Sequence, residues 1–296
     1  QLLNISVFSP KGELITLIGR EGRGPGEFQN IQSLHIDQSD TLWVLDGREL
    51  RISSFTFDGD SYEHITSAAI EQLRDGRPQK AYKIENDGFL VEFSLLDIFS
   101  DMDSSERTYY GLMSHIDSNG NVLDEEVFHY RSNEVFINRQ NGRMMIMTLP
   151  FTPMSTTAFN NEGLVYIGLG DSLKISSYKL NGSLDHTIGG QVKPRKITLD
   201  DTGGSNPSRT SDIGNRMPDV KPAFKSFIVD DINQVWVNLG DLEDEINTWV
   251  VLSKDSELVS SFTFPASFDI QKVQNNRIYG INRDEDEVQS LMVYAY

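Results

Sequence analysis

The chain of 296 residues contains no cysteine. Disulfide bonds, catalytic thiolates, zinc–sulfur sites and iron–sulfur clusters are therefore excluded. The sequence also lacks a run of 18 apolar residues, so it predicts no membrane-spanning helix. Cationic residues are scarce, because 26 Lys and Arg stand against 44 Asp and Glu, which leaves a formal net charge of −18. Binding to a nucleic-acid backbone needs concentrated Lys and Arg, so this balance argues against a nucleic-acid partner.

The sequence contains a repeated pattern of four short predicted strands. The stretch LHIDQSDTLWVLDGRELRISSFTFDGD from Leu34 follows the same plan as TAFNNEGLVYIGLGDSLKISSYKLNGS from Thr157. In both, apolar and polar residues alternate with period two, and turns rich in Gly, Asn and Asp separate the strands. Four antiparallel strands repeated along a chain are typical of a β-propeller. We predict an all-β fold, a six-bladed β-propeller of four-stranded antiparallel blades; a sandwich, a single barrel and a five-bladed ring are the alternatives.

We expect residues 1–296 to form a single domain. The blade pieces are predicted at about residues 1–28, 29–66, 79–130, 154–190, 220–264 and 266–296. The chain opens on the closing hairpin of one blade and ends on three strands of another, so we expect further strands upstream of it. Its first residues lack the basic and apolar regions of a signal peptide, which fits an intracellular or an already processed protein. The only stretch that resembles a helix is SAAIEQLRD, Ser67–Asp75.

The long connections are predicted to lie on one face. In an antiparallel blade, the loops between second and third strands and the connections between blades emerge on the same side. These are the long and varied segments, among them residues 19–32, 46–50, 67–79, 95–108, 131–155 and 189–223. Such loops usually carry the binding function of a regular scaffold, although covering the ends of the core is the alternative. We refer to this side as the long-loop face.

The glycine-rich segment GREGRGPGEF, Gly19–Phe28, belongs to the long-loop face. A phosphate-binding loop would lead into a helix, but the strand-forming sequence NIQSLHID follows here. We therefore interpret the segment as a connector, in which the glycines turn the chain and Phe28 packs at the junction of two blades.

At this segment the chain resembles the NHL-type repeats of six-bladed β-propellers. The opening ISVFSPKGELITLIGREGRGPGEF and the following TLWVLDGRELRISSFTFDG carry the resemblance. The sequence VKPAFKSFIVDDINQVWV, residues 220–237, is similar to a later blade of bacterial six-bladed propeller proteins of unassigned function. Because many of those proteins are exported or lipid-anchored, the resemblance implies a periplasmic, cell-surface or extracellular location. It implies little about function, since this architecture hosts both enzymes and binding modules.

Charged side chains of the long-loop face are the candidate ligand-binding residues: Arg20, Arg23, Asp46, Arg48, Arg74 and Arg77. Guanidinium groups are suited to hold a carboxylate or a sulfate. The favoured alternative is that these arginines form ion pairs with neighbouring acids, namely Glu21, Glu27, Asp46 and Glu49.

Two acidic clusters, LGDLEDE and NRDEDE, are the candidate metal site, with Asp241, Asp244, Asp284 and Asp286 as the proposed ligands. Calcium prefers six to eight oxygen ligands, which carboxylates and carbonyls supply. Neither cluster has EF-hand spacing, and a solvated acidic rim is the favoured interpretation. Calcium is the one cofactor that the sequence suggests.

Other chemical motifs are absent. No H-x-H, H-E-x-x-H or G-x-S-x-G sequence occurs, and the histidines are scattered over three blades, at His35, His64, His115, His129 and His186. Aromatic residues recur inside the predicted second strands, which indicates core packing rather than sugar stacking: Trp43, Tyr166, Trp236 and Tyr279. Trp249, in a third strand, is interpreted in the same way.

We predict from these observations an exported, non-catalytic binding module that presents the long-loop face to a protein or glycan ligand. The alternative is a calcium-assisted hydrolase or lyase with its site at the central channel. Convergent Asp, Glu, Asn or His side chains above a pocket at the axis would favour the enzyme. An exposed patch on the long-loop face would favour the binding module.

Overall fold

The computed structural model of the chain describes residues 3–59, 61–73, 76–84, 88–96, 106–140, 143–198, 201, 217–243 and 246–296. Regular structure in these ranges is β-strand throughout, and none of it is α-helix. A helix long and apolar enough to cross a membrane does not occur in the described ranges. The chain divides into two compact units, residues 1–96 with 110–130 (unit 1) and residues 97–109 with 131–296 (unit 2).

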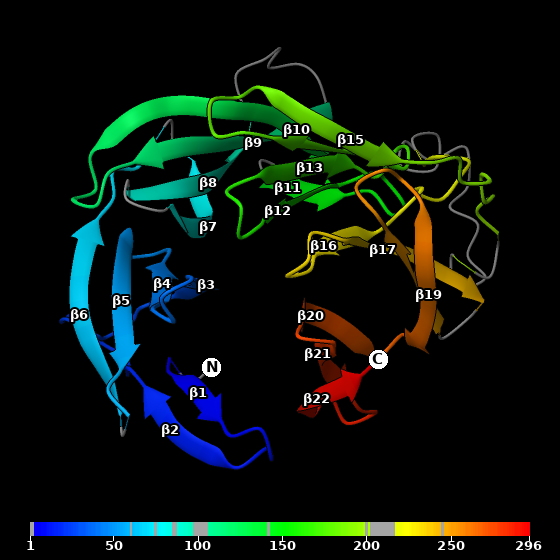
Figure 1. Cartoon of the computed structure of the whole chain (residues 1–296). Coiled ribbons are helices and arrows are strands. Elements are labelled where there is room, and N and C mark those ends of the chain that lie inside the picture. The colour runs from blue at the N-terminus through cyan, green and yellow to red at the C-terminus, as the bar shows by residue number, and fades with distance from the viewer. Residues whose placement is uncertain are drawn as a thin grey trace. The chain divides into compact units, whose positions relative to one another are not determined.

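Unit 1 is built from antiparallel strands that pair in chain order (Figure 1). A two-stranded hairpin comes first, made of β1 (Ile5–Phe8) and β2 (Leu14–Ile18). A four-stranded sheet follows, made of β3 (Ile31–Ile36), β4 (Leu42–Asp46), β5 (Arg51–Phe57) and β6 (Tyr62–Ala69). The next sheet contains β7 (Arg77–Ile84), β8 (Gly88–Leu96), β9 (Glu106–Ile116) and β10 (Val122–Gln140), and its last two strands extend beyond unit 1.

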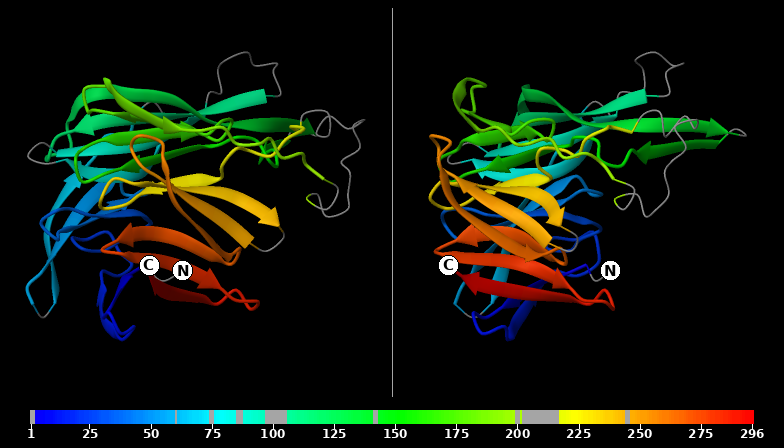
Figure 2. Two further views of the ribbon diagram at one scale, coloured as in Figure 1. Left: turned by 45° about the vertical axis from the view of Figure 1, so that its right-hand side comes forward. Right: turned by 90° about the vertical axis from the view of Figure 1, so that its right-hand side faces the viewer.

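Unit 2 repeats the plan. Its first four-stranded sheet contains β12 (Ser155–Phe159), β13 (Val165–Leu169), β14 (Lys174–Tyr178) and β15 (Leu184–Gly189). The second contains β16 (Ser226–Val229), β17 (Val235–Glu243), β18 (Ile246–Leu252) and β19 (Leu258–Pro265). Three more strands, orange to red in Figure 2, lie side by side: β20 (Phe268–Gln274), β21 (Arg277–Arg283) and β22 (Gln289–Ala295). The predicted four-stranded antiparallel repeat is therefore confirmed, with the opening hairpin and the final three strands where the sequence placed them.

Seven of the described hairpins share one hydrogen-bonded turn. In the β3–β4 turn, Oδ1 of Asp37 accepts hydrogen bonds from the amides two and four residues later, at 2.8 and 3.0 Å. The same pattern of bonds starts from the side-chain oxygens of Ser9, Asp117, Asn160, Asp230, Ser253 and Asp284. Short oxygen-bearing side chains of this kind stabilise turns by bonding to their own backbone.

Two of these turns also fix a tryptophan of the following strand. Oδ2 of Asp37 accepts a hydrogen bond from Nε1 of Trp43 at 2.8 Å, and Oδ2 of Asp230 accepts one from Nε1 of Trp236 at 2.9 Å. Burial raises the pKa of Asp37, but the bonds from Trp43 and two amides outweigh this and lower the pKa below its ordinary value. Asp230 is more deeply buried, and there desolvation prevails and raises the pKa.

The glycine-rich segment is a connector, as predicted. The Phe28 side chain is fully buried among Ile18, Leu42, Val44 and Phe55, so it links the first hairpin to the β3–β6 sheet. Its amide donates to the carbonyl of Arg20 at 2.8 Å, which closes the segment into a loop. Strand β3 follows, rather than the helix that a phosphate-binding loop requires.

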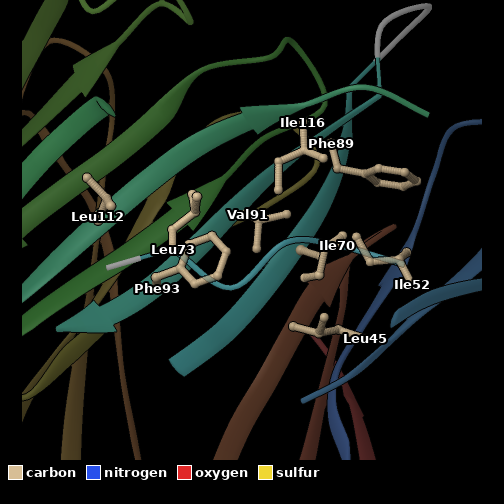
Figure 3. Close-up of a cluster of buried hydrophobic side chains, with 10 residues drawn as sticks. Leu45, Ile52, Ile70, Leu73, Phe89, Val91, Phe93, Leu112 and Ile116 are labelled. Carbon is tan, nitrogen blue, oxygen red and sulfur yellow. The ribbon is translucent and has the colours of Figure 1, made fainter. Parts of the chain in front are cut away.

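Neighbouring sheets pack through aliphatic and aromatic side chains. In unit 1, Leu45 and Ile52 of the β3–β6 sheet meet Phe89, Val91 and other residues of the next sheet in one buried cluster (Figure 3). The predicted packing role of the recurrent aromatics is confirmed most clearly in unit 2, where Tyr166, Trp236 and Trp249 are almost wholly buried. Trp43 is partly buried and packs edge-on against Phe89, and Tyr279 is also partly buried.

The prediction of a helix at Ser67–Asp75 is wrong for its described residues. Ser67–Ala69 form the end of β6 and pair with Arg51–Ser53 of β5. Ile70 and Leu73 then enter the buried cluster of unit 1 as an irregular segment. Local helix propensity is weak compared with a ladder of hydrogen bonds and the burial of two large aliphatic side chains.

The prediction of an irregular connection at 131–155 is also wrong in part. Strand β10 runs to Gln140, and its last residues pair with β11 (Arg143–Thr148), from Val135↔Thr148 to Gln140↔Arg143. The sheet that begins with β7 therefore has five strands instead of the four predicted.

Candidate functional site

One pocket of unit 1 is lined by three parts of the chain. They are the residues around the start of β3, the turn between β4 and β5, and the first residues of β7. The pocket has a volume of about 690 Å³, within the range of roughly 300–1,000 Å³ that is typical of small-molecule sites. Its described lining is polar and comprises Gln29, Asn30, Gln32, Gly47, Arg48, Arg77, Pro78 and Gln79. Segments of unit 1 that are far apart in sequence thus meet at this pocket.

Asp46 holds two of these connections together. It ends β4 and is almost fully buried. Its Oδ2 accepts a hydrogen bond from the amide of Gln29 at 2.6 Å, and its Oδ1 accepts bonds from the amides of Arg48 and Glu49 at 3.0 Å. The amide of Gly47 donates in turn to the carbonyl of Asn30 at 3.0 Å. With both oxygens engaged by backbone amides, Asp46 positions the pocket wall and pairs with no arginine among the described residues.

A chain of carboxamides crosses the pocket wall. Nδ2 of Asn30 donates to Oε1 of Gln32 at 3.2 Å, and Nε2 of Gln32 donates to Oε1 of Gln79 at 3.4 Å. Nε2 of Gln79 then donates to the carbonyl of Arg77 at 3.1 Å. Close by, the Oγ atom of Ser33 accepts a hydrogen bond from the amide of Ala81 at 3.2 Å, so β3 and β7 are tied directly. These amides were not among the site residues predicted from the sequence, although Gln29, Asn30 and Gln32 directly follow the glycine-rich segment.

The arginines of the long-loop face divide into two groups. Arg20 pairs with Glu27 at 2.7 Å, and Arg23 pairs with Glu49 at 3.4 Å, as the alternative interpretation expected. Neither of these arginines lines the pocket. Arg74 lies outside the described residues, so its predicted role stays a prediction.

Arg48 and Arg77 form the second group. Both line the pocket and both are exposed. Neither guanidinium group takes part in an ion pair or a side-chain hydrogen bond with the described part of the chain. The nearby acids are occupied, because Glu49 pairs with Arg23 and Asp46 binds backbone amides. Unpaired positive charge is therefore concentrated at this pocket.

Arg51, which the sequence analysis did not single out, fixes the glycine-rich segment. Its Nη1 donates to the carbonyl of Arg23 at 2.8 Å and its Nη2 to the carbonyl of Glu27 at 2.5 Å. Glu27 accepts hydrogen bonds from the amide of Gly24 and from Arg20, and these bonds, the one from Gly24 first, lower the pKa of its carboxyl group. The charged side chains around this segment therefore stabilise the conformation of the loop.

Of the four proposed calcium ligands, only Asp284 and Asp286 have described side chains, and both belong to one turn. Asp284 forms the repeated turn between β21 and β22, where its Oδ1 accepts bonds from the amides of Asp286 and Val288 at 3.0 and 2.9 Å. Asp241 pairs through its backbone with Asn247 in the β17–β18 hairpin, and Asp244 lies outside the described residues. No group of three or more Asp, Glu or His side chains is placed to hold a metal ion among the residues described.

A serine, a histidine and an aspartate do meet in unit 2, but not as a hydrolytic triad. Nδ1 of His186 lies 2.8 Å from Oγ of Ser177 and also 2.8 Å from Oδ2 of Asp185. A triad uses the two ring nitrogens separately, one for the serine and one for the aspartate. Here one nitrogen serves both, Nε2 is buried without a partner in the described structure, and Ser177 is fully buried. The cluster is therefore a packing feature between β14 and β15.

Comparison with known proteins supports the fold and says little about chemistry. No curated protein matches the sequence. The chain is similar to a member of the DUF4221 family from Bacteroides vulgatus, with 10% identity, a TM-score of 0.56 and coverage of 99% of this chain and 86% of that one. It is also similar to a candidate exported protein from Bacteroides fragilis, with 13% identity, a TM-score of 0.53 and coverage of 99% and 85%. At such low identity these likenesses concern the fold alone. The family model of DUF5128, described as a 6-bladed beta-propeller, matches residues 3–173, so this chain belongs to that family and has the predicted all-β, six-bladed fold.

Proposed function

We propose that the chain is a non-catalytic binding module that holds an anionic group of its ligand on Arg48 and Arg77. The pairing pattern of the arginines carries the proposal. The acids beside the pocket are engaged elsewhere, whereas the two pocket arginines lack a partner in the described structure. A carboxylate or sulfate, carried by a glycan or a protein, would supply the missing acceptors through charge-assisted hydrogen bonds.

The character of the pocket supports binding rather than catalysis. Its described lining consists of amides, two guanidinium groups, a glycine and a proline. None of these is a nucleophile or a general base at neutral pH, since arginine does not lose its proton in proteins and amides do not titrate. The metal-assisted alternative receives no support from the described residues, among which no group of three or more Asp, Glu or His side chains is placed to hold a metal ion.

The proposal places the module outside the bacterial cytoplasm. Its likeness in fold to a candidate exported protein is consistent with export. The net charge of −18 is relevant to the ligand as well, because an acidic chain does not attract anions in general. An anionic ligand would therefore need a local cluster of cations such as the one in this pocket.

Isothermal titration calorimetry tests the proposal. The probes are acetate, glutarate, galacturonate and galactose 6-sulfate, each beside an uncharged analogue, and the proteins are the wild type, Arg48→Gln and Arg77→Gln. Loss of one charge-assisted hydrogen bond costs about 1.5–3 kcal/mol, so each variant should bind the preferred anion roughly 10- to 150-fold more weakly.

Arg20→Gln is the matched control, because it removes a guanidinium group from the same face outside the pocket and leaves the Arg23–Glu49 ion pair in place. Its affinity for the anion should equal that of the wild type. The proposal fails if no anionic probe binds more tightly than its uncharged analogue. It also fails if Arg20→Gln weakens binding as much as the two pocket variants do.

A further inference from the structure

The carboxamide chain of the pocket offers hydrogen-bond donors and acceptors that an anionic group alone cannot fully use. Each carboxamide has two N–H donors and an oxygen with two lone pairs. The bonds from Asn30 to Gln32 to Gln79 use one donor of each residue, and one lone pair of Gln32 and of Gln79. A second donor and at least one acceptor site therefore remain on every amide of the chain.

The internal bonds also fix how these amides are oriented. Because Gln32 accepts from Asn30 and donates to Gln79, its oxygen and nitrogen cannot exchange places without losing both bonds. The bond from Gln79 to the carbonyl of Arg77 fixes the last amide in the same way. The wall thus presents donors and acceptors in a set order, which is the condition for selective recognition of a polar ligand.

A carboxylate or sulfate accepts hydrogen bonds but donates none. Such a group matches Arg48 and Arg77, but it leaves the remaining amide oxygens without donors. A hydroxyl group donates and accepts, so a ligand that complements both parts of the pocket carries an anionic group together with several hydroxyl groups. The described lining has no aromatic ring and only Pro78 as an apolar side chain, which disfavours a flat or apolar ligand.

We infer that the pocket binds a sugar acid, whose carboxylate lies on Arg48 and Arg77 and whose hydroxyl groups bind the chain of Asn30, Gln32 and Gln79. The inference rests on the proposed function and narrows its ligand to one chemical class. A carboxylate fits better than a sulfate ester, because its charge is shared by two oxygens rather than three, so each oxygen is a stronger hydrogen-bond acceptor for the guanidinium groups. The volume of about 690 Å³ is sufficient for a small ligand of this kind.

Three ring-shaped probes separate the two parts of the pocket in a calorimetric or ligand-observed NMR titration. Galacturonate carries a carboxylate and hydroxyl groups, galactose carries hydroxyl groups without the carboxylate, and cyclohexanecarboxylate carries the carboxylate without hydroxyl groups. We expect galacturonate to bind at least tenfold more tightly than either of the others. Galactose 6-sulfate is added as a fourth probe and is expected to bind more weakly than galacturonate.

Single-residue variants test which side chains bind the hydroxyl groups and which bind the carboxylate. Gln32→Met and Gln79→Met keep the length of the side chain and remove its hydrogen bonds. Each should weaken galacturonate binding roughly threefold to tenfold, the effect of about one neutral hydrogen bond, and leave cyclohexanecarboxylate binding unchanged. Arg77→Gln should weaken the binding of both. Gln289→Met, an exposed change in unit 2, is the control and should alter neither.

The outcomes distinguish failure of this inference from failure of the proposed function. If cyclohexanecarboxylate binds as tightly as galacturonate, or if galactose 6-sulfate binds more tightly, the sugar-acid class is refuted while anion binding stands. If galactose binds as tightly as galacturonate, or if no anionic probe binds, the proposed function fails and this inference with it.

Discussion

Replacement of Gly19 by alanine probes the junction on which the long-loop face of unit 1 is built. Gly19 has a φ of +76°, in the left-handed region that side chains disfavour. A Cβ atom placed there would lie 2.2 Å from Cε2 and 2.7 Å from Cδ2 of Phe28. Because the Phe28 ring is fully buried, it cannot move aside without displacing its own neighbours.

The magnitude follows from two contributions. The left-handed backbone costs a residue with a Cβ atom about 1–2 kcal/mol, and forcing an extra atom into a packed core costs about 1–3 kcal/mol. Gly19→Ala should therefore lower the free energy of unfolding by about 2–5 kcal/mol. Gly12→Ala is a matched control in the preceding β1–β2 hairpin, because Gly12 has a φ of +82° and no atom within 4 Å of its Cβ position. That variant should lose only the backbone contribution of about 1–2 kcal/mol.

Urea unfolding followed by circular dichroism and tryptophan fluorescence measures both variants. The same substitution made in a Phe28→Ala variant separates the steric contribution, because Phe28→Ala removes the ring that the added Cβ atom would contact. Phe28→Ala alone should cost about 3–5 kcal/mol, and in that background Gly19→Ala should cost no more than Gly12→Ala does in the wild type. If Gly19→Ala and Gly12→Ala destabilise the wild type equally, the reasoning from close contact with Phe28 is refuted.

Three further predictions concern single side chains. In a double-mutant cycle measured by urea unfolding, Asp230→Asn and Trp236→Phe should show a coupling energy of about 0.5–3 kcal/mol, because the hydrogen bond between the two side chains is buried. A coupling energy near zero would contradict this. Asp37→Asn should lower the free energy of unfolding less than Asp230→Asn does, because Asp37 is less buried. The pKa of Glu27 is lowered in the folded protein, so the carboxylate stabilises the fold at a pH above its unfolded pKa, and this stabilisation is lost as the pH falls. The difference in the free energy of unfolding between the wild type and Glu27→Gln should therefore shrink from pH 7 to pH 3. A difference that stays constant over this range would refute the prediction. Burial, with Glu162 and Asp185 nearby, raises the pKa of Tyr166 to about 12, so this residue should make the wild type lose stability as the pH rises from about 10 to 12. Tyr166→Phe should lose less stability over that range, and below about pH 11 its absorbance at 295 nm should match that of the wild type; equal losses of stability would contradict this.

The strand plan was predictable because it depends on local chemistry. Alternation of apolar and polar residues gives one buried and one exposed side to each strand, and the turns carry residues such as Asp37 and Asp230, whose oxygens bond to nearby amides. The core role of Trp236 was predictable for the same reason, since it recurs at a fixed place in the repeat. Its hydrogen bond to Asp230 was not predicted, although the six-residue spacing recurs in Asp37 and Trp43.

The wrong predictions concern places where contacts with residues distant in the sequence outweigh the local conformational preference. Ser67–Ala69 look helical in isolation, but strand β5 offers them a ladder of hydrogen bonds. Residues 135–140 and 143–148 look like loop, yet they pair with each other as a hairpin extension of β10. Asp46 looks like a ligand on an exposed turn, but the amide of Gln29, 17 residues away, draws it into the interior. A single sequence gives no means of weighing such contacts against local propensity.

The sequence by itself determined the class of fold and the order of the strands, because periodicity and turn chemistry are properties of neighbouring residues. Only the tertiary structure decided which of the predicted site charges form ion pairs. Ion pairing depends on distances between segments that are remote in the chain, and those distances pair Arg20 with Glu27 and Arg23 with Glu49. The same packing of β3 against β7 brings Arg48, Arg77 and the carboxamide chain to one pocket.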